Sequence, residues 1–279
     1  MAAALTAGAC SPLGMVNAIS PDDGVEMVGS FNYGDSDRQR LDIYKPSDTK
    51  ESVLPTVLFF YGGSWKSGKR VDYAFAGRAL ARAGFLVAVA DYRVYPEVTF
   101  PDFVNDAAKA TAWVHVNADR FGGETDNIHL VGHSAGAHMV AMLTLNPAYL
   151  EAEGFDRSIL GRWVGLAGPY AFHPTKYASV RAAFAGLDDE DKARPIVFVG
   201  PGAPPALLLH GAADTTVVPE HSLRLADALR KEGVPATSHL YPDVTHGPLV
   251  AAMSEPLDFL APTLKHTVDY LKSGQVPAE

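Results

Sequence analysis

The sequence predicts an α/β fold with a mostly parallel central sheet and helices on both of its faces. Near-continuous apolar runs such as "TVLFFYGG" and "FLVAVADYR" alternate along the chain with stretches of helical periodicity. Such runs are typical of parallel strands buried on both faces, which need helical crossovers between them. The 279 residues show no internal repeat, low-complexity segment or linker, which favours one large domain.

The first half of the chain is expected to begin with an antiparallel pair and then to become parallel. Alternating apolar and polar residues predict two strands in "VEMVGSFNYG" and "RQRLDIYKP", joined by the turn-rich "GDSD". After Pro55 the expected elements are the strand "TVLFFYGG", a helix near residues 72–83, the strand "FLVAVADYR", a helix over about 103–117, the strand "NIHLVGH" and a helix over about 135–145.

The second half continues the alternation of strands and helices. The expected elements are the strand "RWVGLAGPY", an irregular section to about Gly202, the strand "ALLLHG", a helix over 219–232, the strand "TSHLYPD" and a closing helix over about 257–272. Parallel sheets place their functional sites at the carboxyl ends of the strands. Residues that carry chemistry are therefore expected directly after a strand.

The start of the chain differs from the rest. "MAAALTAGACSPLG" is small and apolar and leads to a cysteine, as the tail of a bacterial lipoprotein signal does, but no basic residue precedes Arg38. We therefore expect residues 1–24 to be an extension, either a disordered terminus or a leader remnant lipidated at Cys10. Residues 25–279 are expected to form a single domain. Its location is left open between the cytoplasm and, if the start is a truncated lipoprotein leader, the bacterial cell envelope.

The composition excludes several classes of function. The 23 Lys and Arg and 32 Asp and Glu give a net charge of −9, with no basic stripe, which argues against nucleic-acid binding. A single cysteine excludes an intrachain disulfide and a thiolate metal cage. No apolar run reaches the roughly 18 residues of a transmembrane segment. The expected partner is a small molecule, and the charge disfavours strongly anionic ones.

Gly132-His133-Ser134-Ala135-Gly136 fits the pattern G-x-S-x-G between a predicted buried strand and a predicted helix. In this context the serine is expected on a strained turn with its hydroxyl projecting above the sheet, as a nucleophile. The glycines are expected because side chains there would collide with the neighbouring strand and helix. The alternative is a plain tight turn of small residues, which the strand-to-helix context disfavours.

A serine nucleophile needs a base, and the base needs a carboxylate. "LLLHGAADTTVVP" places Asp214 just after a strand, and "HLYPDVTHGP" places His246 after the last strand. The order Ser134, Asp214, His246 fits a serine hydrolase triad, with a turn or cap role as the alternative for Asp214 and with Asp243 as the rival acid. Five other histidines are expected to pack, to line the pocket or to support a loop: His133, His138, His210, His239 and His266.

Attack on a carbonyl creates an oxyanion, which needs preorganised amide donors. "FFYGGSWKSG" follows the first parallel strand, and its paired glycines allow close approach of the backbone. The expected donors are the backbone amides of Gly63, Ser64 and Ala135. The alternative for the glycines is an ordinary turn.

With these motifs placed, the chain resembles the α/β-hydrolase superfamily, in the esterase/lipase group related to hormone-sensitive lipase and to arylformamidases and feruloyl-esterase-like carboxylesterases. The supporting stretches are "YGGSW", "DYRVYPEVTFPDFVNDAAKATAW", "GHSAGAH", "HGAADTTVVP" and "DVTHG". The resemblance implies an α/β-hydrolase fold and a serine esterase with no metal or organic cofactor. One departure is Tyr61, where the group usually has His. Its hydroxyl either replaces the usual side-chain contact or the loop differs.

The segment between Ser134 and Asp214 leaves room for only a small or absent cap near residues 173–202. This favours an accessible site. The expected function is therefore a serine carboxylesterase that hydrolyses short-chain or small soluble esters through an acyl-enzyme. The alternatives are an arylformamidase-type amidase with the same triad and a non-catalytic ligand-binding hydrolase fold. The substrate pocket is expected to be lined by Trp65, Tyr95, His133, Tyr170, Phe172 and Val217.

Overall fold

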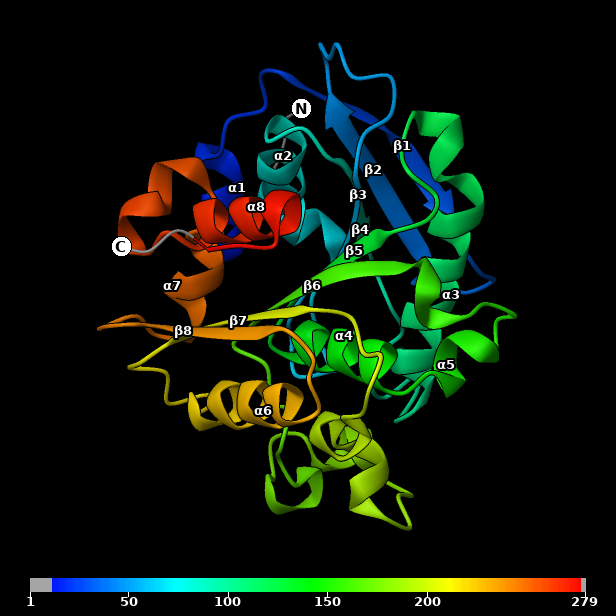
Figure 1. Ribbon diagram of the computed structural model, residues 1–279, viewed down its shortest axis with the longest axis vertical. Helices are drawn as coiled ribbons and strands as arrows, with labels where there is room; N and C mark the ends of the chain where they lie inside the picture. The colour runs from blue at the N-terminus through cyan, green and yellow to red at the C-terminus, as the bar shows by residue number, and fades with distance from the viewer. Residues whose placement is uncertain (1–11, 277–279) are drawn as a thin grey trace, which may run out of the picture.

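The computed structural model describes residues 12–276, and in this part of the chain eight strands form one sheet in the order β1-β2-β4-β3-β5-β6-β7-β8 (Figure 1). β2 pairs antiparallel with β1 and β4, and all other neighbours are parallel. The predicted α/β fold is thereby confirmed. The strands are β1 (Val25–Asn32), β2 (Arg40–Pro46), β3 (Thr56–Phe60), β4 (Leu86–Ala90), β5 (Ile128–His133), β6 (Leu160–Leu166), β7 (Ala206–Gly211) and β8 (Ala236–Tyr241).

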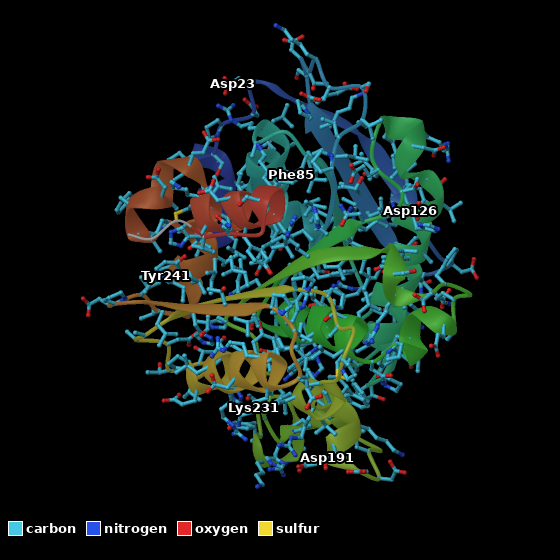
Figure 2. The ribbon with its side chains drawn as sticks, in the orientation of Figure 1. Asp23, Phe85, Asp126, Asp191, Lys231 and Tyr241 are labelled. Atoms are coloured by element: carbon cyan, nitrogen blue, oxygen red, sulfur yellow. The ribbon has the colours of Figure 1, made fainter. Side chains whose placement is uncertain are left out.

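Burial explains why the central strands could be recognised from their apolar runs. Every residue of β3, β4, β5 and β7 is buried, whereas the edge strand β1 has exposed residues along its length. Helices cover both faces of the central strands, so polar side chains on either face would lose contact with water. Phe85, labelled in Figure 2, is fully buried just before β4, and the Lys272 ammonium lies 5.6 Å from its ring centroid.

Helices α1, α2 and α8 lie on one side of the sheet, and α3, α4, α5 and α6 lie on the other (Figure 1). The α-helices are α1 (Pro12–Ile19), α2 (Ala74–Arg82), α3 (Asp102–Asn117), α4 (Ala135–Leu145), α5 (Ala148–Glu151), α6 (Glu220–Lys231), α7 (His246–Ala251) and α8 (Thr263–Ser273). The 3₁₀-helices are η1 (Arg70–Tyr73), η2 (Ala118–Phe121), η3 (Arg157–Ile159), η4 (Pro174–Lys176), η5 (Arg181–Phe184), η6 (Glu190–Ala193), η7 (Pro195–Phe198) and η8 (Glu255–Leu260).

The predicted closing helix over 257–272 is wrong in one respect, because the structure divides it into η8 and α8. The break falls at Ala261, whose backbone is extended with φ −169° and ψ 149°. The cause is Pro262, since a residue that precedes proline avoids the helical region of the backbone.

A small cap connects β6 to β7. Between residues 174 and 198 it consists of η4, η5, η6 and η7, which form the lobe at the bottom of Figure 1. Asp191, labelled in Figure 2, lies in this lobe. The cap is held together partly by Glu190, whose carboxylate accepts hydrogen bonds at 2.8 Å from His173 Nδ1 and at 3.2 Å from the amide of Thr175. The expectation of a small cap thus agrees with the structure.

The segment expected to be an extension is attached to the domain from Pro12 onward. Helix α1 packs on η1 and α2 through Asn17, whose amide nitrogen donates to the carbonyls of Val71 at 2.9 Å and Asp72 at 2.8 Å. The amide of Phe75 donates to Asn17 Oδ1 at 2.8 Å. Arg78 adds hydrogen bonds to the carbonyls of Asn17 and Pro21, and Val16 is buried in the core. The attachment rests on contacts between segments distant in the sequence, which apolar periodicity does not reveal. Cys10 lies outside the described residues.

No helix in residues 12–276 combines the length and the apolar character that crossing a bilayer requires.

Candidate active site

Ser134 occupies the turn between β5 and α4. Its backbone has φ 54° and ψ −117°, a conformation that residues other than glycine rarely adopt. The Ser134 amide donates to the carbonyl of Leu166 at 2.8 Å, which ties the turn to β6. Strained backbone of this kind persists only where the surrounding structure fixes it, and it is concentrated at functional sites.

The two glycines of G-x-S-x-G are required by close packing of α4 against the sheet. A Cβ atom on Gly132 would lie 2.5 Å from the carbonyl oxygen of Gly136. A Cβ atom on Gly136 would lie 2.1 Å from the carbonyl oxygen of Phe60, on β3. Both distances are shorter than real Cβ contacts, and the obstructing atoms belong to the backbone. The pattern therefore reflects a steric requirement of the turn.

Asp214 and His246 are hydrogen-bonded to each other. Asp214, in the loop after β7, accepts a hydrogen bond on Oδ2 from Nδ1 of His246 at 2.7 Å. Its Oδ1 accepts from the amides of Thr216 at 2.8 Å and Val217 at 3.0 Å. Burial favours the protonated acid, but hydrogen bonds from His210, His246 and the Val217 amide dominate and hold the pKa of Asp214 well below its usual range.

His246 also lies beside the serine turn. Its ring centroid is 4.9 Å from that of His133, the residue directly before Ser134. The structure therefore brings Ser134, Asp214 and His246 together at the carboxyl ends of β5, β7 and β8. Asp243, the rival acid, is exposed at the surface, whereas Asp214 is almost fully buried against His246.

The loop after β3 has an unusual backbone. Gly63, Ser64 and Trp65 all have positive φ angles, of 146°, 55° and 56°. A Cβ atom on Gly63 would lie 2.1 Å from the carbonyl oxygen of Ser67, so only glycine fits there. Among residues 12–276 no acceptor faces the amides of Gly63 and Ser64. The amide of Ala135 opens α4 and therefore has no intrahelical partner. The three amides predicted to bind an oxyanion are thus available as donors.

Comparisons with known proteins agree with this geometry. The BD-FAE family model matches residues 41–159, and the prolyl oligopeptidase family model matches residues 173–273. The chain is 35% identical over 254 residues, or 83% of its length, to a probable isoprenylcysteine alpha-carbonyl methylesterase of Oryza sativa subsp. japonica. It is 32% identical over 237 residues, or 77% of its length, to the esterase LipC of Mycobacterium tuberculosis (strain ATCC 25618 / H37Rv). The chain spans 59% and 58% of the length of these two relatives.

Solved structures show the same fold. Esterase B from Lactobacillus Rhamnosis (HN001) aligns with a TM-score of 0.78 at 23% identity, covering 94% of this chain and 91% of that one. Esterase 2 of Thermogutta terrifontis with bound propionate aligns with a TM-score of 0.74 at 24% identity, covering 93% and 98%. The chain belongs to the esterase group of the α/β-hydrolase superfamily. The resemblance stated from the sequence motifs is thereby confirmed.

In this α/β-hydrolase, the side chain of Tyr61 supports the loop after β3 that carries Gly63 and Ser64. Its hydroxyl donates to Asp91 Oδ1 at 2.8 Å and accepts from Arg38 Nη2 at 3.0 Å. The same Arg38 nitrogen donates to the carbonyl of Gly68 at 2.8 Å, at the end of the loop. Burial raises the pKa of Tyr61 far above its usual value, so the phenol remains a donor. The hydroxyl therefore shapes the loop through a charged network.

Replacing Tyr61 with phenylalanine is expected to lower the free energy of unfolding by about 1–3 kcal/mol. The substitution keeps the ring but removes a buried hydrogen bond to each of two charged groups, Asp91 and Arg38. Urea denaturation followed by circular dichroism measures the effect. Tyr95→Phe is the control, because the hydroxyl of Tyr95 makes no hydrogen bond within residues 12–276. Equal stability of the two variants would contradict this account of the network.

A cleft of about 160 Å³ opens at Ser134 and Ser64. Three of the predicted wall residues line it, namely Trp65, Phe172 and Val217. The indole of Trp65 stacks on Phe172 with ring centroids 5.5 Å apart and planes 7° apart, which makes one rigid aromatic wall. The other lining residues are Pro169, Tyr177, Ser179, Val180, Thr215, Thr216, Val218 and His221.

Three predicted wall residues do not line this cleft. Tyr170 is fully buried and packs on Trp163, with ring centroids 6.2 Å apart. His133 lies against the ring of His246, and its burial lowers its pKa well below the usual value, so it remains neutral. The backbone of Tyr95 donates to the carbonyl of Trp65, but its side chain is absent from the lining. No sequence pattern distinguishes such packing residues from residues that line the cleft.

The wall residues that sequence reasoning missed come from the loops after β6 and β7, from the cap and from α6. Tyr177, Ser179 and Val180 belong to the irregular cap, which has no periodicity to predict which side chains face inward. His221 lies in α6, and its Nδ1 accepts a hydrogen bond from the amide of Ala171 at 3.2 Å. Burial lowers the pKa of His221 to about 4, so this wall of the cleft is uncharged near neutral pH.

Within residues 12–276, no group of three or more His, Cys, Asp or Glu side chains is arranged to hold a metal ion.

Proposed function

We propose that the protein is a serine carboxylesterase that hydrolyses esters with small, uncharged acyl groups through an acyl-enzyme. The observation that carries the proposal is the 2.7 Å hydrogen bond from His246 Nδ1 to Asp214 Oδ2 beside the strained turn of Ser134. Because a carboxylate can only accept, Nδ1 carries the ring proton of His246. The lone pair of Nε2 then remains free to accept the proton of the serine hydroxyl.

The reaction follows from these roles. His246 removes the proton of Ser134 as Oγ attacks the ester carbonyl carbon, and Asp214 stabilises the resulting imidazolium. The amides of Gly63, Ser64 and Ala135 stabilise the negative oxygen of the tetrahedral intermediate. The imidazolium then protonates the leaving alcohol, and the carbon–oxygen bond to the alcohol breaks. Water, deprotonated by His246, then attacks the carbonyl carbon of the acyl-enzyme. The bond from this carbon to Ser134 Oγ breaks, His246 returns the proton to Oγ, and the carboxylic acid leaves.

The placement of the cleft supports binding of the acyl group there. The cleft contacts Ser134 and Ser64 but not His246, whereas a leaving alcohol must reach His246 to receive its proton. The alcohol is therefore expected on the opposite side of Ser134. The volume of about 160 Å³ is close to the roughly 150 Å³ of an engineered protein cavity that binds benzene. None of the lining residues carries a full charge near neutral pH.

Two isomeric esters test this orientation. We expect octyl acetate to be hydrolysed with a kcat/KM at least about tenfold higher than that of ethyl octanoate, because the long acyl chain of the latter exceeds the cleft. The two substrates have the same atoms and nearly the same hydrophobicity, so each serves as the control for the other. The rates are measured by titration of the released acid below the solubility limit of each ester. A ratio of one or below would contradict acyl binding in this cleft.

The activity itself is tested with p-nitrophenyl acetate and, in parallel, with formanilide. We expect hydrolysis of the ester, with a much lower rate for the amide. A preference for formanilide would favour the amidase with the same three residues. A phosphonate ester provides a third readout, because it forms a stable covalent bond with an activated serine. Mass spectrometry of the labelled chain is expected to find the phosphonyl group on Ser134. Absence of both hydrolysis and labelling would contradict the proposal.

A further inference from the structure

A second imidazole contacts the carboxylate of Asp214. Nε2 of His210 lies 3.3 Å from Asp214 Oδ2, the same oxygen that accepts from His246. His210 lies in β7, four residues before Asp214, and its side chain is completely buried. Each oxygen of the carboxylate therefore faces two donors, two amides at Oδ1 and two imidazoles at Oδ2. The reaction proposed above assigns no role to His210.

The contacts of His210 determine where its proton lies. Nε2 is 2.8 Å from the carbonyl oxygen of Val217, and Nδ1 is 2.7 Å from the hydroxyl of Ser222. A carbonyl and a carboxylate can only accept, so Nε2 carries the proton. The hydroxyl of Ser222 can donate to Nδ1, so the neutral ring satisfies all of its contacts. One N–H group thus lies between the Val217 carbonyl and the Asp214 carboxylate.

This N–H group connects Asp214 and Val217, the two ends of the loop over residues 214–217. Asp214 and Val217 are also connected by the amide of Val217, which donates to Oδ1. With His210 in place, the carboxylate has little freedom to rotate, and Oδ2 remains directed at His246. We propose that His210 is a positioning residue that fixes the carboxylate of Asp214 in the orientation in which it holds His246. The inference rests on the proposed function, because it acts on the same carboxylate.

The first test compares His210→Leu with His210→Gln. We expect His210→Leu to lower kcat for p-nitrophenyl acetate about 10- to 100-fold while KM changes less than about twofold, since one hydrogen bond to a charged group is lost. His210→Gln is expected to retain most of the activity, because its amide nitrogen can donate from a position near that of Nε2. Unchanged kcat in a folded His210→Leu variant would overturn the proposal.

A control separates positioning from simple stability. His129 is another buried histidine, at the opposite end of β5, and its Nδ1 accepts from the amide of Arg162 at 3.0 Å. His129→Leu is expected to lower the melting temperature without changing kcat per correctly folded molecule. A loss of kcat in this variant equal to that in His210→Leu would show that any buried histidine has the same effect, and would overturn the proposal.

A double-mutant cycle tests whether His210 acts through Asp214. In an Asp214→Ala background, His210→Leu is expected to lower kcat by less than about threefold, because the carboxylate it positions is gone. Losses that multiply as if the sites were independent would overturn the inference.

A spectroscopic readout separates this inference from the proposed function. The hydrogen-bonded Nδ1 proton of His246 is expected as a low-field proton NMR signal in the native chain and in His210→Gln, and to broaden or vanish in His210→Leu. If the native chain hydrolyses no ester but the signal changes in this way, the proposed function fails and the positioning inference stands. If esters are hydrolysed and the signal is the same in all three proteins, the positioning inference fails alone.

Discussion

Replacing Ser134 with alanine is expected to lower kcat for p-nitrophenyl acetate by about 10⁴- to 10⁶-fold. The substitution removes the only atom that the proposed reaction bonds to substrate, and loss of a serine nucleophile has effects of this size in other hydrolases. Alanine is smaller than serine and tolerates the same turn about as well, so the fold is expected to persist. The measurement is the initial rate of ester hydrolysis beside circular dichroism of both proteins.

Two outcomes of that experiment would contradict a serine mechanism. The first is equal activity of Ser134→Ala and the native chain. The second is a similar loss in Ser273→Ala, the control, since Ser273 is exposed at the end of α8 and has no part in the site. The residual activity of Ser134→Ala is itself informative, because the amides of Gly63, Ser64 and Ala135 are expected still to bind a developing oxyanion when water attacks directly.

The nucleophile turn could be predicted from sequence because its constraints are local. Gly132 is required by backbone atoms four and five positions away, and Gly136 is required by the backbone at the end of the adjacent strand β3, so the five-residue pattern contains much of the information. The contact between Asp214 and His246 was also predictable, because parallel strands place the residues that follow them at one edge of the sheet. The central strands were predicted for a similar reason, since burial on both faces demands an uninterrupted apolar run.

Other features depend on contacts between distant segments. The hydroxyl of Tyr61 is held by Asp91 and Arg38, and helix α1 is held by Asn17, in each case through polar groups more than 20 positions apart in the chain. Periodicity and local motifs carry no information on such pairs. The prediction of the cleft walls was incomplete for a related reason. The cap supplies Tyr177 and Val180 from segments without a regular repeat, so no pattern shows which of their side chains face the cleft.

Asp214→Asn is expected to lower kcat by about 10⁴-fold while leaving the fold intact. The amide oxygen of asparagine can still accept from the amides of Thr216 and Val217, which places its NH₂ group where Oδ2 was. An NH₂ group cannot face the Nδ1–H of His246, so the ring proton is expected to move to Nε2. His246 then has no lone pair directed at Ser134 and cannot act as base, an effect of the size known for this change in serine hydrolases.

Asp243→Asn is the matched control for this prediction, because Asp243 lies in the loop that carries His246 but is exposed, with a φ angle of 58° that asparagine also tolerates. Its kcat is expected to remain within about twofold of the native value. Both variants remove one negative charge near the site, so a difference between them reflects the hydrogen bond to His246 and not the net charge. A larger loss in Asp243→Asn than in Asp214→Asn would transfer the role of the acid to Asp243, against the 2.7 Å contact seen here.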